Sequence, residues 1–338
     1  MPISAISYKT KPKTQRISTY DIHEHLIGQD TSVDKILPYI TTHEGGLSSP
    51  DAPVASFFLV GPTGSGKTHT VHCIAEYLHG NPKNFVRIDC AEFQLEHEVA
   101  KLVGAPPGYL GHRETAPILT QQKLNSVTSD RSNLSIVLFD EVEKAAPSLN
   151  RLLLGVLDRA TLKLGDNTNC NFERSLIFFT SNLGTKDINS LTKPFFVLAP
   201  PPPTGGISKK KIENLTTGAL KRHFSPEFLN RIDEFLVYNH LSQSDLEKIL
   251  NLQLANFQKH VESRYGPRSP VLIFTDSLKN ALLRKCEKFT GGRDLKRILR
   301  CHLIQPYAQF LCENGLSPGA SHALGWKSGS LHVTETSV

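Results

Sequence analysis

The sequence predicts an α/β protein, with a large first domain built on a parallel sheet and a small second domain that is mainly helical with a minor sheet. Three observations support this. Short apolar segments alternate with amphipathic ones from about Leu26 to Tyr238, a glycine-rich loop separates a strand-like from a helix-like segment, and helical patterns dominate thereafter. We therefore expect a tail over residues 1–20, a large domain over 21–237 and a small domain over 238–338.

The bulk composition indicates a soluble globular protein. The chain has 338 residues, of which 39% are hydrophobic and 21% charged, as in proteins that bury a sizeable core. No apolar run approaches the roughly 18 residues of a bilayer-spanning helix, and the N-terminus lacks an apolar secretory segment. The six cysteines show no C-x-x-C spacing, so we expect reduced thiols, a cytoplasmic location and no membrane partner.

Two basic segments contribute to the net charge of +6. One is the 1–20 tail, which we expect to be disordered. The other is Lys209–Lys211, within a proline-rich insertion over 186–216 that we expect to be irregular because proline disfavours helices and central strands. Solvated charge is the simplest interpretation of both, and a contact with a polyanion or an acidic protein is the alternative.

Four apolar segments have the length and the Val, Ile, Leu and Phe content of buried parallel strands, namely residues 56–60, 84–88, 135–139 and 175–180. Apolar residues at helical spacing predict a helix over 70–79. The second half is expected to hold helices over 244–265, after Asp276 and from about Arg293, and short strands over 271–274 and 330–334.

The most informative segment follows the first expected strand and fits the phosphate-binding pattern G-x-x-x-x-G-K-[ST]. Its glycines let the backbone wrap closely around an anion, and backbone amides with the helix N-terminus supply positive potential. Lys67 is expected to reach the β- and γ-phosphates of ATP, and Thr68 to bind Mg²⁺. The candidate binding residues of this loop are Gly61, Pro62, Thr63, Gly64, Ser65, Gly66, Lys67 and Thr68.

A second part of the site is expected where Asp140 and Glu141 follow the apolar residues Ile136–Phe139. A buried strand that ends in Asp is how P-loop enzymes place a carboxylate on Mg²⁺. Ligands of parallel sheets bind at the carboxyl ends of the strands, so Asp140 and Lys67 are expected close together. Glu141 would then be the base that orients the attacking water. An acid after a strand is often only a helix cap, and the preceding glycine-rich loop outweighs that alternative.

A third strand end carries Asn182, after the apolar residues Leu176–Phe179. This side chain is expected beside the γ-phosphate, where it would help to hold the water. A turn asparagine close to Gly184 is the alternative interpretation. The order of the three polar strand ends favours the catalytic one.

In this order, the motifs resemble those of an AAA+ ATPase, which is a P-loop NTPase. The closer resemblance is to the Clp unfoldase and disaggregase family, in particular to the second ATPase module of ClpB-like chaperones. The resemblance runs from about residue 20 to about residue 335. Besides the glycine-rich loop, the segments that carry it are Leu26–Asp30, Leu102–Gly111, Phe139–Lys144, Ser225–Asp233 and Gly291–Arg297.

The resemblance implies roles for three further residues. Ile27 belongs to the entry motif near the adenine, and Arg293 is a sensor that contacts the γ-phosphate from the small domain. Arg231 is an arginine finger that enters the site of a neighbouring subunit, so the active form is implied to be a ring, by family a hexamer. A surface Arg231 paired with Asp233 or Glu234 is the alternative.

The resemblance also identifies a pore loop that grips a threaded protein substrate. Its expected residues are Gly108, Tyr109, Leu110 and Gly111, with the ring of Tyr109 making the contact. The alternatives are a Tyr109 that folds onto its own domain and one that stacks on a nucleic-acid base.

Some features depart from the family pattern. No N-terminal recruitment domain precedes the module, and residues 158–172 lack the acidic, glycine-rich hairpin sequence, which puts a second pore loop in doubt. No Ile-Gly-Phe or Ile-Gly-Leu tripeptide occurs in 186–216, so docking to the ClpP protease is disfavoured. The expected function is an ATP-hydrolysing protein unfoldase that uses ATP and Mg²⁺. A nucleic-acid motor or loader is disfavoured because no nucleic-acid module is visible, and an ATP-binding assembly factor is the other alternative.

Overall fold

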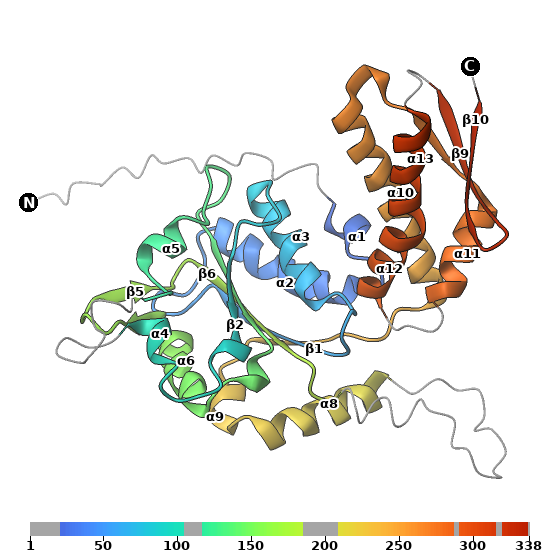
Figure 1. The fold of residues 1–338 in the computed structure, drawn as a ribbon. Coiled ribbons are helices and arrows are strands. Elements are labelled where there is room, and N and C mark those ends of the chain that lie inside the picture. The colour runs from blue at the N-terminus through green and yellow to red at the C-terminus, as the bar shows by residue number, and fades with distance from the viewer. Residues whose placement is uncertain (1–20, 105–116, 185–208, 287–290, 316–319, 337–338) are drawn as a thin grey trace, which may run out of the picture.

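The computed structural model describes residues 21–104, 117–184, 209–286, 291–315 and 320–336. They form two lobes, shown in Figure 1. The larger lobe is a parallel sheet covered by helices, and the smaller lobe packs helices against a short sheet at the C-terminal end of the chain. The predicted α/β fold class with a small, mainly helical second domain is therefore confirmed.

The main sheet of the described residues has five strands in the order β2-β3-β6-β1-β7, and all neighbouring pairs are parallel. The four predicted strands all form, and the edge strand β7 was not predicted. The strands are β1 (Ala55–Val60), β2 (Val86–Asp89), β3 (Ser135–Asp140), β6 (Ser175–Ser181) and β7 (Glu234–Val237).

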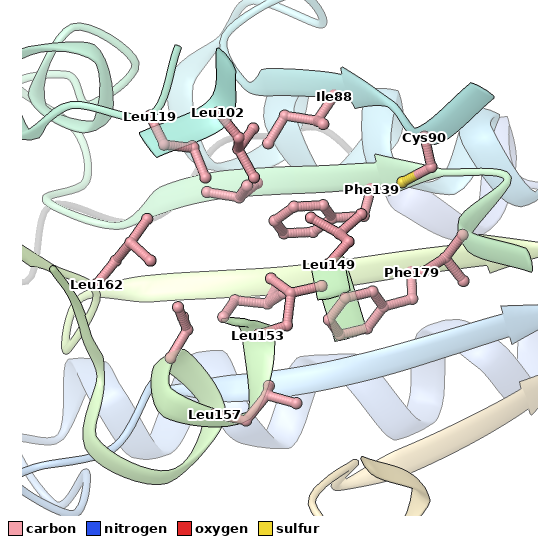
Figure 2. Close-up of a cluster of buried hydrophobic side chains, with 14 of the residues drawn as sticks. Ile88, Cys90, Leu102, Leu119, Phe139, Leu149, Leu153, Leu157, Leu162 and Phe179 are labelled. Atoms are coloured by element: carbon pink, nitrogen blue, oxygen red, sulfur yellow. The ribbon is translucent and has the colours of Figure 1, made fainter. Parts of the chain in front are cut away.

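Both faces of this sheet are buried, which explains why its strands read as continuous apolar runs. In β1, Phe57 and Leu59 pack towards α2 (Asp30–Glu44) and α3 (Lys67–His79), while Phe58 and Val60 pack towards α6 (Pro147–Arg159) on the other face. Figure 2 shows part of this second cluster, with Leu149 and Leu153 of α6 close to the rings of Phe139 and Phe179. Shorter helices complete the lobe: α1 (Ile22–His25), α4 (Ala100–Val103), α5 (Gln121–Asn125) and α9 (Pro226–Leu229).

Two regions of the large lobe differ from the prediction. Lys209–Lys211 open helix α8 (Lys209–His223), so the expectation of irregular structure up to residue 216 is wrong for these residues. Residues 161–171 form a hairpin of β4 (Thr161–Lys163) and β5 (Asn169–Asn171) although they lack the expected hairpin sequence. Its turn instead uses Asn167 with a positive φ of 68° and Asp166, whose side chain accepts the N–H of Thr168 at 2.9 Å.

The small lobe begins with the long helix α10 (Gln243–Tyr265), which starts with a capping box of Ser242 and Asp245. It has its own core, to which Leu250, Leu282 and Tyr307 contribute. The short sheet has the order β10-β9-β8, and its middle strand β9 was not predicted. The remaining elements are α11 (Asp276–Cys286), α12 (Gly292–Leu299), a π-helical turn (Arg300–Ile304), α13 (Gln305–Asn314), β8 (Val271–Phe274), β9 (Ser321–Lys327) and β10 (Ser330–Thr336).

Among the described residues, no helix combines the length and the apolar character that crossing a membrane requires. All six cysteines carry free thiols, and four of them are buried.

Candidate active site

A cavity of about 440 Å³ lies between the two lobes, beside the carboxyl ends of β1, β3 and β6. This is where parallel sheets bind their ligands. The predicted residues that line it come from both lobes and are Ile27, Thr63, Gly64, Ser65, Gly66, Lys67, Thr68, Asp140, Glu141, Asn182 and Arg293. The structure thus brings together, in one cavity, segments up to about 270 residues apart in the chain.

The loop that joins β1 to α3 forms one wall of the cavity, and its glycines are required by its geometry. Gly61 has a φ of 151°, and a Cβ there would lie 2.4 Å from the carbonyl oxygen of Tyr238. Gly66 caps α3 with a φ of 108°. Both conformations are costly for other residues. Tyr238, fully buried, also places its hydroxyl 2.6 Å from Thr70 of α3, so the start of the linker to the small lobe is fixed against the loop.

The ammonium group of Lys67 lies in the centre of this loop. It donates to the carbonyls of Gly61 at 2.6 Å and Pro62 at 2.9 Å, and to the side-chain oxygen of Asn182 at 2.9 Å. Burial lowers the pKa of Lys67 to about 8, and the nearby Arg293 guanidinium acts in the same direction, while the carboxylates of Glu143, Asp140 and Glu141 oppose the shift. A phosphate group bound in this loop would give the ammonium a direct anionic partner.

The carboxylate of Asp140 lies at the end of β3 and is 10% exposed. One of its oxygens accepts a short hydrogen bond from the Thr180 hydroxyl, and the other lies 2.6 Å from the guanidinium of Arg87. Thr180 in turn accepts the backbone N–H of Glu141 at 2.9 Å. These contacts fix the orientation of the Asp140 side chain at the end of β3.

Glu141 adopts a left-handed backbone conformation with a φ of 56°, which is strained for a residue with a side chain and is common at functional sites. Its carboxylate forms an ion pair with Lys144 and accepts a hydrogen bond from the Asn182 amide at 3.3 Å. Asn182 therefore stands between Lys67 and Glu141, and its backbone N–H is held by Glu143 at 2.9 Å.

The small lobe forms the opposite wall. The N–H of Gly292 donates to the carbonyl of Gly64 at 3.0 Å, and Gly291 approaches the same residue so closely that a Cβ would lie 2.9 Å from its Cα. These contacts place the N-terminus of α12 over the loop. From there Arg293 and Lys296, one turn apart, face the cavity.

A further part of the cavity lining is apolar, and it suits a heteroaromatic base. Its residues are Leu26, Ile27, Leu241, Ile249 and Leu252. These apolar residues, a glycine-rich cradle with a buried ammonium, and the hydroxyl of Thr68 with the carboxylate of Asp140 together match the parts of a nucleoside triphosphate with a hard divalent cation. The residues present therefore fit MgATP.

Other predicted residues lie elsewhere. Arg231 does not line the cavity; its guanidinium forms ion pairs with Asp158 and with Glu227, the latter at 3.3 Å. The alternative pairing of Arg231 with Asp233 or Glu234 is wrong. The Asp233 carboxylate accepts the Ser56 N–H at 2.7 Å, and Glu234 pairs with Lys35. The four pore-loop residues Gly108–Gly111 lie outside the described residues.

Several residues of the cavity were not predicted. Arg87 and Asp89 enter it from β2, and His25, His69 and His72 lie near its apolar side. Burial lowers the pKa of His69. The sequence feature that could have identified Arg87 as a cavity residue is a single charged residue within an expected apolar strand. The apolar stripe of α10 was visible in the sequence, yet nothing in it distinguished cavity-lining from core positions.

Two protein-family models match the chain. "AAA domain (Cdc48 subfamily)" matches residues 52–235, and "C-terminal, D2-small domain, of ClpB protein" matches residues 241–323. The first match ends within β7, and the second begins just before α10.

Similar proteins cover nearly all of this chain. The chaperone protein ClpB of Meiothermus ruber is 31% identical over 99% of the chain and 36% of its own length. The ATP-dependent Clp protease ATP-binding subunit ClpA homolog of Trieres chinensis is 33% identical over 94% of the chain and 37% of its own length. The chain thus spans a little over a third of these relatives.

A solved structure is also similar. It is a closed-state cryoEM reconstruction of Hsp104 with ATPγS and FITC casein, with a TM-score of 0.74 and 26% identity over 92% of this chain and 50% of that one.

Proposed function

We propose, from the premise that this chain belongs to the AAA domain family (Cdc48 subfamily) of ATPases, that it hydrolyses MgATP between its lobes and uses the cycle to pull on protein substrates as a ring. The observation that carries the proposal is the single cavity that joins Lys67, Asp140, Glu141 and Asn182 to Arg293 of the other lobe. A site closed by two lobes changes shape when its ligand changes, which couples hydrolysis to movement.

Each residue has a distinct task in this reaction. Lys67 exchanges its carbonyl partners for phosphate oxygens and stabilises the charge that develops on the transferring group. Glu141 orients the attacking water and accepts its proton on the oxygen that now faces the Asn182 amide. Asn182 holds the water from the other side. Thr68 and Asp140 would hold Mg²⁺, which neutralises phosphate charge when it is bound.

The position of Arg231 supports a ring. Its guanidinium lies outside its own cavity and is held by Asp158 and Glu227. An arginine presented in this way is available to a neighbouring subunit's site, as an arginine finger supplied in trans. The site would then be complete only in an oligomer, for which the family suggests a hexamer in the cytoplasm.

The residues on either side of the expected pore loop support threading. Lys101 and Leu102 accept backbone hydrogen bonds from Ile118 and Leu119 at 3.3 and 3.2 Å. The residues that precede and follow the expected pore loop therefore lie side by side. The β4–β5 hairpin adjoins them, because the N–H of Gly165 donates to the carbonyl of Val103 at 2.8 Å. The proposal therefore places the hairpin on the same substrate path as Tyr109.

The proposal is tested with Glu141→Gln, which keeps the shape of the side chain and removes the base. We expect ATP binding to persist and hydrolysis to fall by about a hundredfold or more. With ATP bound, the variant should migrate as a ring and retain a fluorescent denatured protein during size-exclusion chromatography.

Two matched variants control this experiment. Glu234→Gln removes a carboxylate at the far edge of the same sheet and should hydrolyse ATP normally. Tyr109→Ala, added to Glu141→Gln, should leave the ring intact and release the denatured protein. Retention of single-stranded DNA instead of protein would favour the nucleic-acid motor, and a monomer that hydrolyses ATP at full rate would contradict the ring.

A further inference from the structure

Among the described residues, Arg87 is the one that forms an ion pair with Asp140. The proposed reaction gives Arg87 no task. It lies on β2 opposite Leu138 of β3. Leu138 faces the α3 side of the sheet, as does Asp140 two residues further on. The strand register therefore directs Arg87 towards Asp140 and into the nucleotide cavity, which it lines.

The contact occupies a carboxylate oxygen that the proposed reaction needs. The guanidinium lies 2.6 Å from one oxygen of Asp140, and the Thr180 hydroxyl occupies the other. Both oxygens therefore already have a donor. A divalent cation that approaches this carboxylate meets a positive charge beside it, and the two cations repel each other.

The guanidinium is also placed so that another cation can replace it. The Asp140 side chain is 10% exposed, whereas the Arg87 side chain is 53% exposed and can turn into water while its partner stays in place. A buried carboxylate that loses its partner needs another positive charge, which a divalent cation would supply. The core residues of β2 on either side of Arg87, Val86 and Ile88, point to the opposite face of the sheet. Their packing therefore does not require the Arg87 side chain to be buried.

We propose that Arg87 is a positioning residue that holds Asp140 while the site is without nucleotide and competes with Mg²⁺ for its carboxylate. The inference rests on the proposed function, because it assumes that this cavity takes MgATP. Between cycles, Arg87 keeps the Asp140 carboxylate aligned and neutralised. Arg87 leaves this carboxylate only when a divalent cation arrives with the nucleotide.

The experiment measures binding rather than turnover. A fluorescent ATP analogue is titrated into the full chain in excess EDTA and then at stepwise concentrations of free Mg²⁺. In Arg87→Met, which removes the charge and keeps the length, we expect the Mg²⁺ concentration for half-maximal tightening to fall about two- to fivefold. Arg87→Lys keeps a cation and should restore most of the original requirement.

Two controls separate this effect from a general loss of structure. Lys35→Met removes a surface pair of similar exposure, 3.0 Å from Glu234, and should leave the Mg²⁺ requirement unchanged. In an Asp140→Asn background, Arg87→Met should have no further effect on Mg²⁺, since the carboxylate is gone.

The inference is overturned if Arg87→Met leaves the Mg²⁺ requirement unchanged or raises it. It is equally overturned if Arg87→Met still weakens binding in EDTA in the Asp140→Asn background, which would make Arg87 a phosphate ligand. If the unsubstituted chain binds no nucleotide, the proposed function itself is overturned. This outcome can be told apart from failure of the Arg87 inference, because no variant would then show binding.

Discussion

The two walls of the nucleotide cavity are built differently. The large-lobe wall is buried, and both Lys67 and Asp140 make more than one polar contact within their own lobe. The small-lobe wall consists of apolar residues such as Ile249 of α10 and of the N-terminal end of α12. Among the described residues, one backbone hydrogen bond joins α12 to the loop, from Gly292 to Gly64. Its charged residue Arg293 extends into the cavity from that end.

This difference assigns different work to the two walls. A wall fixed by burial and hydrogen bonds is already organised for phosphate before the ligand arrives, which lowers the cost of binding. A wall with few described polar contacts to the loop can move at lower cost. This agrees with the proposed division of work, in which the large lobe holds the nucleotide and the small lobe responds to the γ-phosphate.

The largest effect should come from the fixed wall. Lys67→Ala removes the only ammonium that reaches the loop carbonyls among the described residues, and we expect ATP affinity to fall by at least about a hundredfold. Isothermal titration calorimetry would measure the loss. Lys35→Ala, a change on the outer surface, should bind ATP normally, and a Lys67→Ala protein with near-normal affinity would show that the wall does not depend on its charge.

A second effect follows from the low pKa of this lysine. Because the pKa of Lys67 is about 8 before binding and an anionic phosphate raises it, ATP binding takes up a proton at higher pH. Affinity should be flat below pH 8 and should fall as pH rises above it, by about tenfold for each further pH unit until the pKa of the bound state is reached.

The measurement is the dissociation constant across pH 7 to about 9.5, the range that brackets this pKa. Lys67→Ala serves as the control, because it should lose this slope together with its affinity. A slope that persists in Lys67→Ala would assign the titration to another group.

The sequence predicted the fixed wall well and the movable wall partly. The glycine-rich loop, the polar strand ends and the chain order of Lys67, Asp140 and Asn182 can each be recognised from the sequence. This is possible because backbone geometry and phosphate chemistry allow only a few residue types at these positions. Arg293 was found through resemblance. Its position depends on the packing of α12 over Gly64, a contact more than 200 residues away in the chain that no local pattern encodes.

The elements that were missed have physical reasons of the same kind. Strand β9 contains a glycine and the buried His322, which is tolerated because the Tyr307 hydroxyl lies 2.8 Å from its ring nitrogen. Strand β7 is short and lies at the sheet edge. The Arg87–Asp140 pair joins residues 53 positions apart through strand register. Helix α8 begins with three lysines directly after a proline-rich segment, and composition alone favoured irregular structure there.

The smallest effect should come from the movable wall. Gly291 has a φ of 154°, and a Cβ would lie 2.9 Å from the backbone of Gly64. In Gly291→Ala we expect α12 to be pushed away from the loop, because strain of this kind costs about 1–3 kcal/mol and, among the described residues, one backbone hydrogen bond joins the two. ATP should bind about three- to fivefold more weakly, with the thermal unfolding of the large lobe unchanged.

The adjacent glycine offers a matched control for this change. At Gly292 a Cβ would lie at an ordinary 3.7 Å from Gly64, and alanine is favourable near the start of a helix, so Gly292→Ala should bind ATP like the unsubstituted chain. Binding is measured by calorimetry and unfolding by scanning calorimetry on the same samples. Equal losses in both variants would mean that the wall responds to any added volume, whereas a loss in Gly291→Ala alone means that its position is set by this one close approach. In that case the small lobe is held over the nucleotide by the close contact of Gly291 with Gly64 more than by charge.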